Sequence, residues 1–287
     1  VTVHALTSGR STTGTAGVNV GGGSFRPAKI PKVLLLVGDS INLYDAGEIW
    51  HLLDYRMQMP VTLRARESLA GLNWNDYTHI VFPAGVYENY DADFAARLRL
   101  WIAEGGTAVA LRNAAPWLRA NTLDWIDPLS IEQPVQTGAL QEPADGTEAK
   151  ADIERTPYSE KDTVEATDLI GGAIFAADLD ITHPLGFGYQ QRQLFLHKNF
   201  REVFAPAENP FSTVIAYDKN PVYSGYVSES NSTALASTPA LIAERSGAGS
   251  VILFADNPNF RGYWYGTNKL FLNALFFSTL FDPVADY

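Results

Sequence analysis

Three short stretches, each directly after an apolar run, carry the polar side chains with which this chain could bind a ligand. The candidate residues are Asp39, Ser40, Asn113, Asp256, Asn257, Arg261 and Trp264. The densest group lies between Asp256 and Arg261, and aromatic residues at positions 263–265 follow it. Polar groups beside aromatic rings suit a sugar or a peptide terminus, and the Arg261 guanidinium could pair with a carboxylate. The alternative is structural: Asp256 or Asn257 caps a turn, Arg261 pairs internally, and the aromatic side chains pack against the last helix.

Ser40 lies where a sheet would present a nucleophile, but its surroundings do not match one. A serine elbow requires the spacing Gly-x-Ser-x-Gly, and this stretch reads Gly-Asp-Ser-Ile-Asn from Gly38 to Asn42. We therefore favour capping of the following turn by Asp39, Ser40 or Asn42. A hydrolase that uses the carboxylates of Asp39 and Asp256 stays open as a further hypothesis.

One stretch has the spacing of a weak metal site. Glu48, His51 and Asp54 follow one another at intervals of three residues, so Glu48 and His51 could share one face of a helix. No second segment supplies further ligands, and apolar residues at positions 50, 52 and 53 surround the histidine. We therefore favour a hydrogen-bonded histidine at a helix–core boundary, and the sequence predicts no metal or other cofactor in this chain.

Composition excludes several classes of protein. The chain of 287 residues has no cysteine, so it forms no disulfide, no thiolate zinc site and no cysteine nucleophile. Its net charge of −11 argues against binding to nucleic acid or to an anionic membrane surface. No apolar run approaches the roughly 18 residues of a membrane span. The chain begins with Val1 and shows no signal peptide, which suggests a processed protein or a piece of a longer one.

Alternating strands and helices should position the candidate residues. The apolar run that ends at Gly38 predicts a strand buried on both faces, and Ile49, Leu52, Leu53 and Met57 predict a helix after it. The next expected elements are strands over residues 61–63, 77–83 and 107–111 and a helix over residues 94–102. This order predicts a doubly wound, mostly parallel α/β sheet, in which ligands bind beyond the carboxyl ends of the strands.

The rest of the chain departs from this alternation. Residues 1–30, rich in glycine, serine and threonine, predict a linker or a short N-terminal extension before a single domain over residues 31–287. Residues 127–165, rich in proline, glutamate and aspartate, predict an insertion. The other elements expected are added β-hairpins with turns at residues 218–220 and 246–249 and a closing helix over residues 267–280.

This order of elements resembles the class I glutamine-amidotransferase-like fold, which contains a flavodoxin-like sheet. The stretch from Val251 to Phe277 resembles the C-terminal region of large bacterial zinc carboxypeptidases of the carboxypeptidase A type. Residues 45–54 (Asp-Ala-Gly-Glu-Ile-Trp-His-Leu-Leu-Asp) and residues 180–185 (Asp-Ile-Thr-His-Pro-Leu) resemble the same family. In that family a metallopeptidase domain precedes an amidotransferase-like domain, and the resemblance implies that this chain is the second domain.

Both families need catalytic residues that this chain lacks. The amidotransferase cysteine would lie in the elbow after residues 107–111, where the sequence is Arg-Asn-Ala-Ala-Pro. The amidotransferase histidine would follow the last strand, where the sequence is Ala-Asp-Asn-Pro from Ala255. No histidine begins a His-x-x-Glu zinc pair, and His51 with Asp54 comes nearest. The amidotransferase mechanism is excluded, and a zinc triad would have to lie outside this chain.

The first functional hypothesis is therefore a non-catalytic accessory domain of a bacterial zinc metallocarboxypeptidase. By resemblance, the whole protein would act in proteolysis by removing C-terminal residues from peptides, and it would be periplasmic or extracellular. The resemblance implies zinc in the absent catalytic domain, which would be the partner of this chain in the same polypeptide, and a peptide or glycan is a further expected partner. The second hypothesis is a free-standing peptide- or carbohydrate-binding protein, and the third is the carboxylate-dependent hydrolase.

Overall fold

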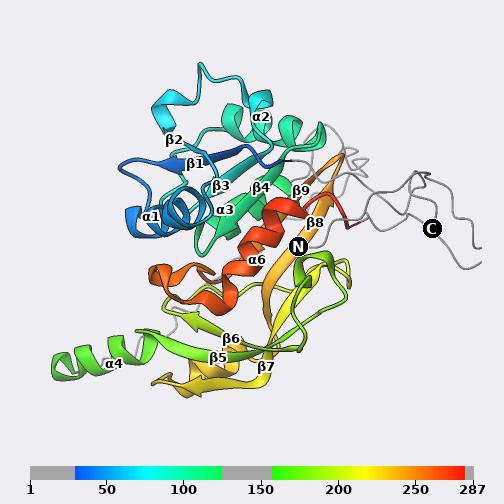
Figure 1. The fold of residues 1–287 in the computed structure, drawn as a ribbon. Coiled ribbons are helices and arrows are strands. Elements are labelled where there is room, and N and C mark those ends of the chain that lie inside the picture. Colours follow the sequence, from blue (N-terminus) through cyan, green and yellow to red (C-terminus); the bar gives the residue numbers. More distant parts are fainter. Residues whose placement is uncertain (1–29, 125–156, 282–287) are drawn as a thin grey trace, which may run out of the picture.

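One mixed sheet runs through the computed structural model, which describes residues 30–124 and 157–281 (Figure 1). The strand order is β2-β1-β3-β4-β9-β8-β7-β5-β6. The expected linker over residues 1–30 lies outside the described residues except for Ile30. Of the expected insertion near residues 127–165, residues 127–156 lie outside the described residues.

The described residues form nine strands, six α-helices and several short helices. The strands are β1 (Val33–Val37), β2 (Val61–Ala65), β3 (His79–Phe82), β4 (Thr107–Leu111), β5 (Ala173–Leu179), β6 (Gln193–Lys198), β7 (Thr213–Ser224), β8 (Pro239–Ser246) and β9 (Gly249–Phe254). The α-helices are α1 (Leu43–Trp50), α2 (Ala92–Ala103), α3 (Ala114–Thr122), α4 (Lys161–Asp168), α5 (Glu229–Leu235) and α6 (Tyr265–Phe276). A π-helix, η1 (His51–Arg56), continues α1, and the 3-10 helices are η2 (Arg66–Ser68), η3 (Trp74–Asp76), η4 (Tyr158–Glu160), η5 (Pro184–Gly186) and η6 (Phe260–Gly262).

The inner strands of the parallel half, β1, β3, β4 and β9, are buried on both faces. Strands β2, β1, β3, β4 and β9 run parallel, in this spatial order. In β1, Leu34 and Leu36 belong to the core that α2 and α3 cover, whereas Val33 and Leu35 belong to the core under α1, η1 and α6. The chain passes from β1 outward to β2 and then returns to β3 on the other side of β1, so the strand order reverses between β1 and β3. The predicted α/β class and the buried first strand are confirmed, but the sheet is mixed and not mostly parallel.

The other half of the sheet is antiparallel and holds a correction. Strands β8 and β9 form the second expected hairpin, with Ser246 paired to Gly249. The first expected hairpin is wrong, because residues 218–220 lie inside the single strand β7. Residues 217 to 222 of β7 span the same part of the ladder as residues 175 to 177 of β5, so the polar residues form a bulge and not a turn.

Several boundaries follow the sequence patterns. The strands expected at residues 61–63, 77–83 and 107–111 are β2, β3 and β4, and the closing helix is α6. The described end of the expected insertion contains α4, whose side chains are exposed from Lys161 to Thr167 and which extends away from the sheet in Figure 1. Among residues 30–124 and 157–281, no helix has the length and apolar character needed to cross a membrane.

Candidate functional site

A cleft opens at the carboxyl edge of the parallel half, where the expected ligand site lies. Its volume is about 860 Å³. The lining comes from α1 and its flanks between Asn42 and His51, from Arg112 after β4, from Asn199 after β6, and from residues 260–262 of η6. The strand-end rule therefore predicts the position of this cleft.

Helix α1 and the first residue of η1 present the ionisable side chains of Asp45, Glu48 and His51 to this cleft. Asn42 caps the helix, because its side-chain oxygen accepts hydrogen bonds from the backbone N–H groups of Tyr44 and Asp45, at 3.0 and 3.4 Å. This is the capping expected of Asp39, Ser40 or Asn42, and Asn42 provides it. Asp45, Glu48 and His51 follow at intervals of about one turn, and all three line the cleft.

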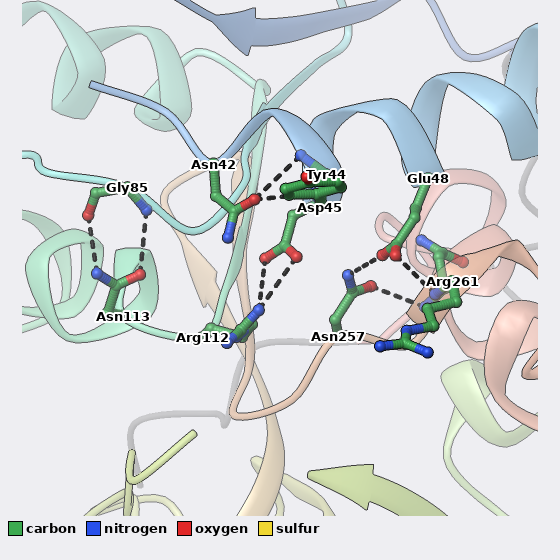
Figure 2. A network of polar contacts seen from close by, with 10 residues as sticks. Asn42, Tyr44, Asp45, Glu48, Gly85, Arg112, Asn113, Asn257 and Arg261 are labelled. Atoms are coloured by element: carbon green, nitrogen blue, oxygen red, sulfur yellow. Dashed lines mark hydrogen bonds and ion pairs between the residues drawn. The ribbon is translucent and has the colours of Figure 1, made fainter. Parts of the chain in front are cut away.

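Arg112 occupies the elbow where the amidotransferase resemblance would place a cysteine. Its Nη1 donates to both Asp45 carboxylate oxygens, at 3.1 and 3.2 Å (Figure 2), and its guanidinium lies 4.6 Å from the centre of the Phe200 ring. Burial raises the pKa of Asp45, and the neighbouring positive charge of Arg112 acts in the opposite direction. The two residues form a buried ion pair in the cleft wall.

Glu48 is fixed through both of its oxygens. One oxygen accepts a hydrogen bond from the Arg261 backbone N–H, at 2.6 Å, and the other accepts from the Asn257 side-chain amide (Figure 2). Burial raises the pKa of Glu48 to about 7, although the Arg261 N–H lowers it, and the charge of Asp45 adds to the increase. Glu48 therefore changes charge near neutral pH while its position is held.

Two residues of the cleft lining have a left-handed backbone conformation. Four non-glycine residues among those described have left-handed φ values, and two of them, Arg112 (φ 54°) and Arg261 (φ 51°), line the cleft. Such conformations cost of order 1–3 kcal/mol each and persist only where the surroundings enforce them. At Arg261 this conformation accompanies the hydrogen bond from its backbone N–H to Glu48.

The structure separates the two neighbouring candidates Asp256 and Asn257. Asn257 faces α1 and holds Glu48. Asp256 turns into the antiparallel half, where its oxygens bind the ammonium of Lys198, at 3.0 Å, and the Tyr217 hydroxyl. Asp256 does not line the cleft, and its buried contacts are structural.

The remaining candidates lie around the cleft but not in its lining. Asp39 is exposed in the turn after β1, with Ser40 beside it. The Asn113 amide bonds both backbone groups of Gly85, at 3.1 and 2.9 Å, and so ties the β3 loop to the β4 elbow (Figure 2). Trp264 donates its indole N–H to the Phe195 carbonyl of β6. Of the sequence candidates, Arg261 and the weak metal candidates Glu48 and His51 line the cleft.

Other lining residues escaped the sequence reasoning. Asp45 has a usable signal, because it lies three residues before Glu48 on the same helix face. Arg112 could have been noticed only because it stands where the amidotransferase family has its cysteine. The sequence around Asn199 and Phe260 gives no indication that these residues line a cleft. Within the part of the chain that the structure describes, no three histidine, cysteine or acidic side chains come together as a metal site.

Comparisons with known proteins correct the family resemblance. No protein-family profile matches the sequence, and no curated protein matches it. A solved ThuA-like protein from Parabacteroides merdae has a TM-score of 0.50 and 10% identity, over 90% of this chain and 93% of that one. A ThuA-like protein from Bacteroides uniformis has a TM-score of 0.48 and 10% identity, over 91% and 96% of the two chains.

The resemblance to zinc carboxypeptidases is therefore wrong, because the similar structure with a TM-score of 0.50 is a ThuA-like protein, which belongs to a distinct family. The metallocarboxypeptidase hypothesis therefore loses its basis. The expectations of zinc in a missing domain, of a catalytic partner domain and of export lose the support that they took from it. At this level of identity the likeness concerns the fold alone: the chain has a mixed α/β fold, consistent with a class I glutamine-amidotransferase-like fold.

Proposed function

We propose that this chain binds a carbohydrate in the cleft between α1, the β4 elbow and η6. The observation that carries the proposal is the mixture of acceptors and donors in one hollow. Glu48 and Asp45 supply carboxylate oxygens, Arg112 and Arg261 supply N–H donors, and Asn199 offers both. Sugar hydroxyl groups donate and accept hydrogen bonds, so they match such a mixture.

The charge arrangement favours a sugar over a peptide terminus. A terminal carboxylate needs a cation that is free to pair with it, but Arg112 already pairs with Asp45. Glu48 lies against the Arg261 backbone, so a carboxylate ligand near Arg261 would meet a second negative charge above pH 7. Neutral hydroxyl groups avoid this repulsion, and the exposed Tyr44 ring in the same lining offers an apolar face.

We also infer that the parallel half is a flavodoxin-like, class I glutamine-amidotransferase-like unit. The spatial order of its strands, β2-β1-β3-β4-β9, matches the flavodoxin order, in which ligands bind at the β1/β3 switch point. The cleft begins directly after β1, which supports a ligand-binding role for this edge.

Glu48→Gln tests the proposal. Sugars retained from a glycan array are titrated into the protein by calorimetry at pH 6 and pH 8. Because the pKa of Glu48 is about 7, the carboxylate form dominates at pH 8, and it accepts hydroxyl hydrogen bonds better than the protonated form. We expect the wild-type affinity to rise from pH 6 to pH 8, and Glu48→Gln to bind about tenfold more weakly at pH 8 with no such rise.

The matched control for this experiment is Glu104→Gln, at the exposed far end of α2. This variant should keep both the wild-type affinity and its pH dependence. Equal binding by the wild-type protein and Glu48→Gln at both pH values would refute the cleft as the sugar site.

A second candidate function, an acid–base enzyme, is favoured by one observation. A carboxyl group with a pKa of about 7, held through both oxygens, suits proton transfer at neutral pH. The hydrolase hypothesis would then use Asp45 and Glu48, because Asp39 and Asp256 do not line the cleft. Turnover of nitrophenyl glycosides that disappears in Glu48→Gln would support an enzyme, whereas tight binding without turnover would support a binding protein.

A further inference from the structure

Two pairs of aromatic rings form a strip that begins in the cleft lining and follows β6 to β7. The strip consists of Phe260, His197, Phe195 and Tyr223. Phe260 lines the cleft, and the His197 ring stacks on it with a centroid distance of 3.5 Å and an angle of 13°. Phe195 lies two residues before His197 on β6, hence on the same face of the strand, and its ring centre is 4.4 Å from that of Tyr223 on β7.

The local sequence explains why these rings are at the surface. Along β6 the side chains of Leu194, Leu196 and Lys198 are buried, while Phe195 and His197 between them remain partly exposed. Strand β5 lies between β6 and β7, and there the partner of Phe195 is Ala176. Its small side chain leaves room for the Phe195 and Tyr223 rings to meet across β5.

The rings of the strip are accessible at the surface of the molecule. Tyr223 is 64% exposed and the other three rings are partly exposed. Contiguous apolar surface of this kind commonly marks a site of interaction. The strip consists of flat rings, and flat rings suit stacking against the C–H faces of sugar rings.

We propose that the strip is an extension of the cleft and that the ligand is an oligosaccharide. This inference rests on the proposed carbohydrate-binding function. One end of the oligosaccharide occupies the cleft beside Glu48, and the following sugar units stack on His197, Phe195 and Tyr223. The continuity of Phe260 with both the cleft and His197 joins the two regions into one site.

Other occupants fit the strip less well. A peptide strand or a second copy of the chain would add to the edge of β6 through main-chain hydrogen bonds, but the Trp264 indole N–H already occupies the Phe195 carbonyl at 3.3 Å. An anionic membrane surface would be repelled by a chain with a net charge of −11. A neutral glycan meets neither obstacle.

The test compares sugars of different length from the same series. Calorimetry measures the affinity of a monosaccharide and of the corresponding tetrasaccharide, taken from the series that a glycan array retains. We expect the tetrasaccharide to bind the wild-type protein at least about tenfold more tightly than the monosaccharide. Tyr223→Ala should reduce this preference about three- to tenfold and leave monosaccharide binding unchanged.

Matched variants separate this inference from the proposed function. Phe195→Ala, checked for folding by circular dichroism, should act as Tyr223→Ala does, and Tyr158→Ala, exposed on η4, should change nothing. Glu48→Gln should weaken both sugars by the same factor. If the wild-type protein does not prefer the tetrasaccharide, or if Tyr223→Ala keeps the preference, the proposal for the strip is overturned. The proposal for the cleft would be unaffected.

Two further results would also contradict the proposed binding of a carbohydrate in the cleft. If Tyr223→Ala abolishes binding that Glu48→Gln does not affect, the cleft proposal fails and the strip is not its extension. If the array retains no glycan, both the carbohydrate function and the strip are overturned.

Discussion

Replacing Asp256 with alanine should lower the free energy of unfolding by about 3–5 kcal/mol. The reason is Lys198, whose side chain has 0% exposure and whose ammonium binds Asp256, at 3.0 Å, with the Glu202 carbonyl and the Tyr217 hydroxyl as further partners. Removing the carboxylate leaves a buried positive charge without its counter-charge. Urea unfolding followed by circular dichroism measures the loss.

Asp39→Ala is the control for this prediction. Asp39 is the second carboxylate of the hydrolase hypothesis in the sequence analysis. Because its side chain is exposed, its loss should change the free energy of unfolding by no more than about 0.5 kcal/mol. The double variant Lys198→Met/Asp256→Leu should recover much of the stability, because well-packed apolar side chains can replace a buried ion pair. Similar stabilities for Asp256→Ala and Asp39→Ala would contradict the structural role of Asp256.

The second large effect concerns the Asp45–Arg112 pair, whose two members should respond differently to pH when separated. Asp45→Ala leaves a buried guanidinium that cannot lose its proton, so we expect a loss of about 3–5 kcal/mol at both pH 5 and pH 8. Arg112→Met leaves a buried carboxylate that can take up a proton. Its destabilisation should therefore be large at pH 8 and smaller at pH 5.

The direction of this pH dependence follows from the pKa of Asp45. Burial raises this pKa, and the positive charge of Arg112 lowers it. Removing Arg112 raises this pKa further, so the folded state binds a proton at a higher pH than the unfolded state does. Stability then increases as the pH falls through the raised pKa. Urea unfolding of both variants and the wild-type protein at the two pH values measures the difference, and equal pH dependence in the two variants would argue against the pair.

The fold was predictable where burial alone dictates the pattern. Strand β1 and strand β4 are apolar on both faces, so their sequences had no other good interpretation. The hairpin expected at residues 218–220 failed because the bulge between β5 and β7 accommodates polar residues inside a strand. Local sequence does not distinguish such a bulge from a turn.

The position of the cleft was predictable, but the contacts of its side chains were not. The strand-end rule places a ligand at the carboxyl edge, and the cleft is there. The neighbours Asp256 and Asn257 point in different directions because Lys198 attracts one and Glu48 attracts the other, and both partners are distant in sequence. Arg112 stands where the amidotransferase resemblance places a cysteine. Its role in an ion pair could not be predicted, because its partner Asp45 comes from another element.

The most direct test of the carbohydrate-binding cleft is a crystal structure of the chain with the glycan that an array retains best. We expect a sugar unit in the cleft with a hydroxyl group within hydrogen-bond distance of Glu48. A glycan bound elsewhere, for example in the hollow beside Arg66, Trp74 and Arg97, with Glu48 untouched, would contradict the account.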